Sequence, residues 1–293
     1  MSIFSKQFRD HWQLYAFIFP ILLYFVIFVF YPLAQGIWMS FQKMGLLGPM
    51  GFIGQENYRI VFTDPTVIQS TISTIVIAAS ITIFGFALPI LPAIAIHEIT
   101  RITWKRLFQT IIYMPYLFSW VIIIGIWMNL LSPIGLVNSI LVSIGLLDIP
   151  ISFFSSPNFA RTLLVGQTVW KDLGFNAVIY LAAIVSINPE LYEAAEIDGA
   201  SVFHKIRYII LPHIYPAMQI VFLITLVGSL RTFDSSYLMT NGLTADKITT
   251  LAMLIYERGL LEFDLGVASA AGVLLLAISI LFALTASKIV GYK

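Results

Sequence analysis

The stretch that decides the fold reads Pro189-Glu-Leu-Tyr-Glu-Ala-Ala-Glu-Ile-Asp-Gly-Ala-Ser-Val-Phe-His-Lys-Ile-Arg-Tyr-Ile-Ile-Leu-Pro-His-Ile-Tyr-Pro216, the longest mixed polar segment of an otherwise apolar chain. Asn188 can cap a first helix, and Ser201 can cap a second one. Gly199 follows an aspartate and forms a turn between them, because glycine reaches positive φ at no steric cost. We expect Pro212 to bend or end the second helix, since proline has no amide to donate.

The composition of the chain is that of a membrane protein. Hydrophobic residues make up 59% and charged residues 11%, with a mean hydropathy of +0.92. Soluble domains carry about 25% charged residues. The net charge of +1 gives no case for nucleic-acid binding. The absence of cysteine excludes disulfides and thiol chemistry.

Six segments are apolar over the roughly 20 residues that cross a bilayer. They must be helical, because a backbone in lipid has to satisfy its own hydrogen bonds, and their continuous apolar runs disfavour the alternating strands of a barrel. The first is too long for a signal-peptide core, so we read it as a retained span. The predicted class is therefore all-α and polytopic, a single domain over 1–293 with a core bundle over about 67–290. The segments are about 14–34, 67–96, 107–130, 163–187, 214–230 and 265–290.

The basic residues predict the orientation. Lysine and arginine concentrate in loops that fall on one side if there are six spans, and such loops are cytoplasmic. Both termini and the segment 189–216 are then cytoplasmic, and residues 4–12 are expected to lie on the membrane surface. The basic residues concerned are Lys6, Arg9, Arg101, Lys105, Arg106, Lys205, Arg207, Lys288 and Lys293.

The polar segment matches a known spacing. Glu193-Ala194-Ala195 is followed after three residues by Gly199, and then by Ile209 and Leu211-Pro212. This pattern resembles the EAA loop of bacterial ABC importer permeases, and its fuller form is similar to the carbohydrate-uptake branch, in particular the larger-type partner of the maltose/oligosaccharide permease pair. An ordinary amphipathic loop helix is the alternative, but four matched elements over twenty residues favour the resemblance.

The resemblance implies a type I ABC importer permease with about six spans and a cytoplasmic coupling helix. It implies a heterodimer with a second permease subunit, an ATPase subunit dimer that binds ATP and Mg²⁺, and an extracytoplasmic solute-binding protein in the bacterial inner membrane. The substrate would be a sugar, an oligosaccharide or a related polyol, translocated by alternating access. The residues that would contact the ATPase subunit are Glu193, Ala194, Ala195, Asp198, Gly199, Leu211 and Pro212.

No catalytic constellation is visible in the chain. It lacks the Gly-x-x-x-x-Gly-Lys-Ser/Thr loop of ATPases and the His-Glu-x-x-His pattern of zinc enzymes, and its 4 histidines are scattered. We therefore predict no enzyme activity, no metal site and no cofactor in this chain. Any ATP hydrolysis would belong to a separate subunit.

Two charges fall inside a predicted span, where charges are costly and mark cavities or pairs. Lys171 and Asp172 either form a polar wall of a transport path or pair with each other near the outer membrane edge; the pair is slightly preferred. Farther on, Thr240-Asn241-Gly242 is similar to the family. The family commonly continues with Gly and Pro where this chain has Leu243-Thr244, so the contact with a binding protein stays open.

Hydroxyls, carboxylates and aromatic rings near the fifth segment are candidates for the substrate path. The resemblance places the sugar site of such permeases there. The alternatives are a helix-end cap with an Arg–Asp pair, and interface anchoring for the tryptophans. The candidates are Trp120, Trp170, Asn176, Ser229, Arg231, Thr232, Phe233 and Asp234.

The predicted function is the permease subunit of an ATP-driven carbohydrate importer. The alternative from another class is a secondary transporter driven by an ion gradient, whose interrupted spans come in repeats. Pro89 and Pro92 suggest one interrupted span, but no matching half is present.

Overall fold

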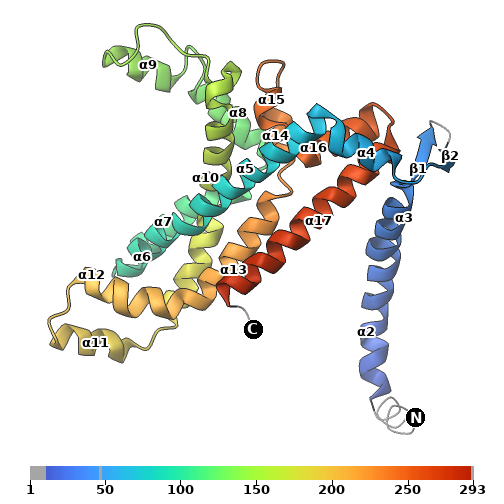
Figure 1. Cartoon of the computed structure of the whole chain (residues 1–293). Coiled ribbons are helices and arrows are strands. Elements are labelled where there is room, and N and C mark those ends of the chain that lie inside the picture. Colours follow the sequence, from blue (N-terminus) through green and yellow to red (C-terminus); the bar gives the residue numbers. More distant parts are fainter. Residues whose placement is uncertain (1–10, 46–47, 292–293) are drawn as a thin grey trace. The chain divides into compact units, whose positions relative to one another are not determined.

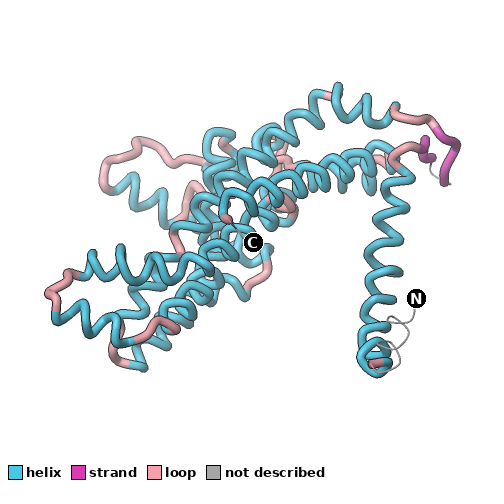
Figure 2. The backbone as a smooth tube through the Cα atoms, turned by 60° about the horizontal axis from the view of Figure 1, so that its bottom comes forward, coloured by secondary structure: helices cyan, strands magenta, loops and turns pink. Residues whose placement is uncertain are grey.

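The computed structural model describes residues 11–45 and 48–291. Helices dominate it, with one short hairpin (Figures 1 and 2). Backbone contacts divide the chain into a first unit, residues 1–64 with 255–274, and a second unit, residues 65–254 with 275–293. Residues 4–10 of the predicted surface segment 4–12, and the basic residues Lys6, Arg9 and Lys293, lie outside the described residues.

The first unit begins with an apolar helix of 28 residues, Trp12–Met39, none of which is buried. It consists of α2 (Trp12–Phe25), the π-helical turn η1 (Val26–Phe30) and α3 (Tyr31–Met39). A helix so apolar on every side needs lipid or another protein around it.

A hairpin and a short helix complete the N-terminal part of the first unit. Strands β1 (Gln42–Gly45) and β2 (Gly48–Phe52) pair antiparallel, a small β element that the all-α prediction did not include. The buried Asn57, in α4 (Glu56–Thr63), donates from Nδ2 to the carbonyl oxygens of Ser40 and Gln42, both at 2.9 Å. These two bonds fix α4 to the start of the hairpin. The unit also contains η4 (Glu257–Leu261) and the first turns of α17 (Leu265–Val290).

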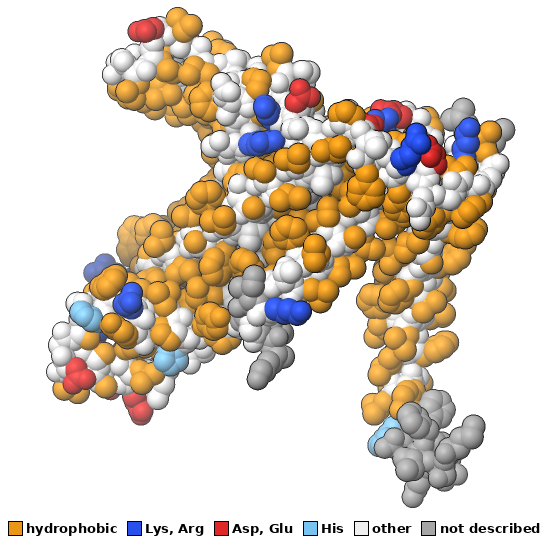
Figure 3. Space-filling model, viewed as in Figure 1, with side chains coloured by type: hydrophobic (Ala, Val, Ile, Leu, Met, Phe, Trp, Pro, Cys, Tyr) orange, Lys and Arg blue, Asp and Glu red, His pale blue; other side chains and the backbone are white. Residues whose placement is uncertain are grey.

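The second unit is built around α10 (Pro157–Val185), which packs against α5 (Pro65–Ala87), α6 (Ile90–Glu98), α7 (Ile102–Leu117) and α13 (Leu211–Ser229). Its core joins Tyr180 and Ile184 of α10 to Ile96 of α6 and Ile214 of α13. Hydrophobic side chains cover the lengths of the spans and charged side chains gather toward their ends on the face in Figure 3. The smaller elements are α9 (Leu136–Ser143), η2 (Phe153–Ser155), α14 (Asp234–Met239), α15 (Ala245–Ile248) and α16 (Leu251–Tyr256).

The third predicted span is not one straight helix. The chain forms α7 (Ile102–Leu117) and α8 (Trp120–Leu130), which meet at 103°. Pro115 has no amide to donate, Phe118 is extended with ψ 146°, and the Ser119 side chain caps α8 by accepting from the Ile122 amide at 3.5 Å. The described residues therefore hold 5 helices long enough to span a membrane, or up to 6 if the bent pair counts as one.

The polar segment folds as its caps predict. The Asn188 side chain accepts from the Glu190 amide at 3.2 Å, and the Ser201 side chain accepts from the His204 amide at 3.4 Å. Gly199 has φ +70° and forms the turn between α11 (Pro189–Ile197) and α12 (Val202–Lys205). These two helices lie together at one end of the second unit (Figure 1).

Pro212 does not end the helix, in contrast to one of the predicted outcomes. A π-helical turn, η3 (Ile206–Ile210), joins α12 to α13, so that Val202–Ser229 forms one candidate span of 28 residues. In this turn the Leu211 amide donates to the Ile206 carbonyl, five residues back. The wider turn lets the chain pass the proline, whose missing amide breaks the regular ladder.

The close packing of α7 on α10 depends on Gly174. A Cβ atom there would lie 2.2 Å from the Ile112 carbonyl oxygen and 2.6 Å from the Tyr113 Cα, whereas one at Gly166 of the same helix would meet nothing within 4 Å. We expect Gly174→Ala to lower stability by about 1–3 kcal/mol, because the two backbones must separate. Gly166→Ala should be neutral or slightly stabilising.

Thermal unfolding of the two variants in one detergent, at one scan rate, checks this expectation. If Gly174→Ala unfolded at the same temperature as Gly166→Ala, that result would contradict the close contact between α7 and α10.

Candidate functional site

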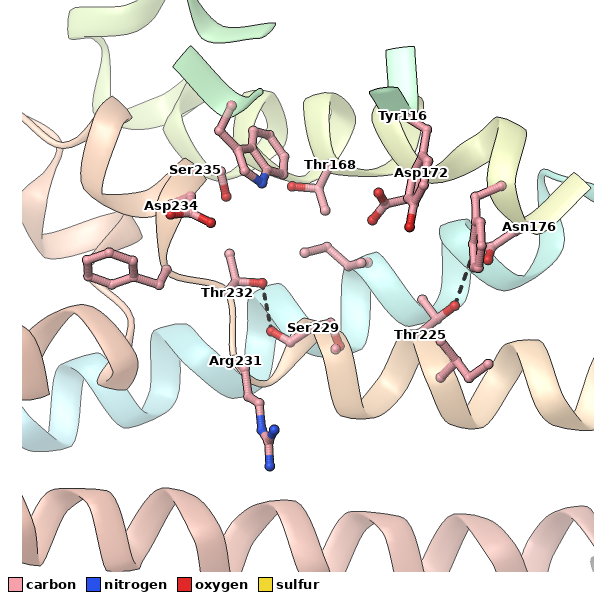
Figure 4. A pocket seen from close by; sticks show the side chains of 16 residues that line it. Tyr116, Thr168, Asp172, Asn176, Thr225, Ser229, Arg231, Thr232, Asp234 and Ser235 are labelled. Carbon is pink, nitrogen blue, oxygen red and sulfur yellow. Dashed lines mark hydrogen bonds between the residues drawn. The ribbon is translucent and has the colours of Figure 1, made fainter. Parts of the chain in front are cut away.

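A cavity of about 320 Å³ opens inside the second unit, within the bundle. It lies between α10, α13 and the start of α14, with the broken helix α7–α8 and α5 contributing to its walls (Figure 4). Polar and aromatic side chains share its surface. They are Ile81, Tyr116, Trp120, Thr168, Asp172, Phe175, Asn176, Ile224, Thr225, Gly228, Ser229, Arg231, Thr232, Phe233, Asp234 and Ser235.

One face of α10 supplies a row of polar groups to the cavity. Thr168, Asp172 and Asn176 follow one another at intervals of four residues, which places them on the same side of a helix. Asn176 donates from Nδ2 to the Gly85 carbonyl oxygen at 3.1 Å and to the Thr225 hydroxyl at 3.5 Å, so it ties α10 to α5 and α13. Among the ion pairs and hydrogen bonds of the described residues, the half-buried Asp172 side chain takes part in none.

Lys171 does not pair with Asp172, so the ion pair preferred from the sequence was wrong. Its ammonium donates to the carbonyl oxygens of Tyr116 at 2.8 Å and Phe118 at 2.7 Å, with a longer contact of 3.5 Å to that of Pro115. The last carbonyls of a helix have no partner in their own helix. The free carbonyl groups at the break after α7 therefore bind the ammonium of Lys171. The neighbouring carboxylate of Asp172 lines the cavity instead.

Polar residues at the end of α13 form the facing wall. The Ser229 hydroxyl donates to the Leu226 carbonyl oxygen at 2.9 Å and lies 3.2 Å from the Thr82 hydroxyl. Thr232 donates to the Ser229 carbonyl oxygen at 2.8 Å. Arg231 points away from the space between the walls (Figure 4), and the alternative of an Arg231–Asp234 ion pair is wrong, because none forms within the described chain.

Aromatic rings line the side of the cavity near the helix break. Tyr116 stacks on Phe175 with ring centres 4.7 Å apart, and Trp120 begins α8 beside them. The Lys171 ammonium lies 5.4 Å from the Tyr116 ring centre and 5.7 Å from that of Trp120, within cation–π range. Lys171 thus contacts both rings as well as the carbonyl groups at the end of α7.

The structure brings together all but one of the predicted path residues. Trp170 lines a separate apolar groove on another face of α10, with Phe84 of α5 and Leu88 just after that helix, and its ring lies edge-on to that of Trp127, 5.8 Å away. The other predicted residues line the cavity; whether they contact a substrate stays a prediction. They are Trp120, Asn176, Ser229, Arg231, Thr232, Phe233 and Asp234.

Several lining residues were not predicted as path residues. The four-residue spacing along α10 could have indicated Thr168 beside Asp172. No sequence signal could have placed Tyr116 or Phe175, because their positions follow from the break after α7. Ser235, which is 1% exposed, directly follows the predicted candidate Asp234 in the chain.

The segment 189–216 presents charge and apolar surface at the end of the second unit. Glu193, Ala194, Asp198 and Gly199 are exposed, and Ala195 is half-buried. Exposed apolar side chains that the sequence analysis did not single out lie beside them: Ile197, 88% exposed, with Val202 and Phe203. Clustered exposed apolar residues of this kind mark interaction surfaces.

A salt bridge fixes α11 to α12. The Lys205 ammonium lies 2.7 Å from Glu196 Oε1. The hydrogen bond and the positive charge of Lys205 lower the pKa of Glu196 below its usual value. Across the described residues, no group of three or more His, Cys, Asp or Glu side chains is placed to hold a metal ion.

Known proteins are similar to this chain in sequence and in fold. Residues 85–290 match the family model described as binding-protein-dependent transport system inner membrane component. The polygalacturonan/rhamnogalacturonan transport system permease protein YteP of Bacillus subtilis (strain 168) is 31% identical over 94% of this chain and 87% of its own. The sn-glycerol-3-phosphate transport system permease protein UgpA of Pectobacterium atrosepticum is 32% identical, covering 96% and 94%.

A solved structure shows the same fold. The crystal structure of a bacterial ABC transporter involved in the import of the acidic polysaccharide alginate contains a chain that is 31% identical, with a TM-score of 0.88 over 98% of both chains. The chain described here therefore has the fold of that permease, with several apolar helices in the inner membrane.

Lys171 should be required for a stable helix break. We expect Lys171→Met to lower stability by roughly 2 kcal/mol or more, because it leaves buried carbonyls without donors. Lys171→Arg keeps the positive charge and the hydrogen-bond donors, so its stability should fall by less than that of Lys171→Met. Unfolding midpoints of both variants in detergent check this, and a Lys171→Met protein with the wild-type midpoint would contradict the role of the lysine.

The salt bridge at α11 and α12 should make their turn sensitive to pH. Because the pKa of Glu196 is lowered in the folded chain, its stabilising effect is fully present above the ordinary glutamate pKa of about 4.3 and is lost as the pH falls through the lowered value. We expect amide hydrogen exchange in residues 189–205 to be slower in the wild type than in Glu196→Gln at pH 7. The difference should disappear in acid, and a difference that persists there would contradict this account.

Proposed function

This chain belongs to the family of binding-protein-dependent transport system inner membrane components, and we propose that it is the permease subunit of an ABC importer for a carbohydrate or a related polyol. One observation carries the proposal. The helix Val202–Ser229 runs through η3 and α13 from the exposed segment to the cavity, where Thr225 and Ser229 line the wall. At 1.5 Å per residue it is about 42 Å long, so one continuous helical segment connects the two places.

In this proposal the segment 189–216 is the coupling element. Glu193 offers a polar contact to an ATPase subunit, while Ala194 and Ala195 permit close approach of another backbone. Gly199 sets the turn, and the motif residues Asp198, Leu211 and Pro212 complete the docking segment. The exposed apolar residues Ile197 and Phe203 support a protein contact here.

Transport would proceed by alternating access between an inward-open and an outward-open state. The ATPase subunits, and not this chain, would bind ATP and Mg²⁺, since the sequence lacks a phosphate-binding loop. Nucleotide can drive the cycle only through its different affinity for the two states. Motion of α11 and α12 would then reach the cavity through the helix that follows.

The partners would be a second permease subunit, an ATPase dimer on the cytoplasmic side and an extracytoplasmic solute-binding protein. The dependence on a binding protein is part of the family description, and the solved relative is an ABC transporter. The distribution of basic residues supports cytoplasmic termini and a cytoplasmic coupling segment.

Co-purification tests the proposal against the secondary transporter, whose spans can also be interrupted as α7–α8 is. An importer should yield a complex whose ATPase activity rises with loaded binding protein. Its uptake in cells should survive an uncoupler and stop without ATP. A chain that purifies alone and whose uptake collapses with the ion gradient would favour the secondary transporter.

The turn at Gly199 gives a sharper test of coupling. Valine is strained at φ +70°, whereas asparagine tolerates this left-handed conformation. In proteoliposomes we expect Gly199→Val to lose about 90% or more of transport while basal ATPase activity remains, since misplacing a docking contact commonly costs tenfold or more. Gly199→Asn should stay near the wild type. Normal transport by Gly199→Val would contradict the coupling role.

A further inference from the structure

We propose that the cavity selects saccharide units that carry no acidic group, with Asp172 as its specificity-determining contact and Ser235 as a further contact to sugar hydroxyls. The inference rests on the proposed transport function and narrows its substrate class. It concerns the part of the path that this chain builds.

The charged side chains that line the cavity are mostly acidic. Asp172 and Asp234 both line it, one from α10 and one from the start of α14. The lysine next to Asp172 is turned to the carbonyl oxygens at the end of α7, with distances of 2.7 and 2.8 Å. Arg231, the single cation among the described lining residues, points away from the cavity in Figure 4.

An acidic ligand would therefore meet two carboxylates, and no cation among the described lining residues points into the cavity. Repulsion between two charges is stronger in a half-buried site than in water. A sugar hydroxyl instead donates to a carboxylate, in a hydrogen bond that is stronger than one between neutral groups. Asp172, whose carboxylate forms no hydrogen bond or salt bridge among the described residues, can accept such a bond.

Ser235 provides a second, independent observation. Its side chain is 1% exposed, and its buried hydroxyl makes no hydrogen bond within the described chain. In Figure 4 it stands on the same wall as Thr168, at the edge of the empty space. Burying an unpaired hydroxyl is costly, so such a group needs an external partner. A sugar hydroxyl, which both donates and accepts, can bond to it.

The aromatic side of the cavity fits the remaining surface of a sugar. A pyranose ring has an apolar face of C–H groups, and the Tyr116–Phe175 stack with Trp120 offers apolar rings beside the polar row of α10. The volume of about 320 Å³ lies at the lower end of small-molecule pockets. The site therefore suits one or a few neutral sugar rings. Sharing the fold of the alginate importer does not imply that this chain also takes an acidic substrate.

The test uses the purified complete importer and measures direct binding by saturation-transfer NMR, so that the binding protein does not select the ligand first. The probes are matched trisaccharides of gluco, galacto and manno configuration, each with the uronate that differs only at C6. We expect at least one neutral member to bind and its uronate to bind about tenfold more weakly.

Single-residue variants test which side chains cause the preference for neutral sugars. Asp172→Asn keeps the shape and should reduce the preference for neutral sugars about tenfold, because the repelling charge is gone. Ser235→Ala should weaken neutral binding about threefold to tenfold without changing the ratio. Gly166→Ala, on another face of α10, is the matched control and should behave as the wild type. Unfolding midpoints establish that each variant is folded.

Several outcomes would overturn the inference. The wild type could bind a uronate as well as its neutral partner, or Asp172→Asn could leave the ratio unchanged. Asp172→Asn could also release the second permease during purification, which would assign the carboxylate to subunit assembly. If no saccharide binds to a complex whose ATPase responds to loaded binding protein, the inference fails while the importer stands. If ATPase coupling itself is absent, the proposed function fails.

Discussion

A helix that ends at membrane depth must find donors for its last carbonyls, and the second unit depends on how this chain solves that problem. Lys171 donates to the carbonyl oxygens of Tyr116 and Phe118, where α7 stops. The contact holds α7 against α10, and Gly174 one turn farther on lets the two backbones meet. With the lysine engaged, Asp172 forms no salt bridge with it. One requirement of the backbone thus shapes both the packing and the charge of the cavity.

The long helix Val202–Ser229 gives the second unit its functional continuity. A proline near its start would normally interrupt the hydrogen-bond ladder. The π-helical turn η3 lets the chain pass Pro212, so that the helix reaches from the exposed turn to the polar wall. Such turns occur often at functional sites. A continuous connection of this kind is what a transporter needs if energy is released at one end and the substrate is held at the other.

The similarity to known permeases and the local chemistry of the cavity answer different questions. A chain of an alginate importer has the same fold at 31% identity. Fold similarity at this level fixes helices and their packing, whereas substrate choice depends on a few side chains in the cavity. In the selection that we propose, those side chains are the carboxylate of Asp172, the unpaired hydroxyl of Ser235 and the rings beside Trp120. The proposal makes the charge of the substrate the first property on which the site discriminates.

The sequence alone determined what depends on neighbours along the chain. Hydropathy located the spans, and the caps at Asn188 and Ser201 with the turn between them predicted α11 and α12, because these features need only a few adjacent residues. The tertiary structure decided what depends on helix rotation and distant contacts. It broke the third span, turned Lys171 away from Asp172 and directed Trp170 into another groove. Periodicity gives the faces of a helix, but the partner of each face is chosen only when the helices pack.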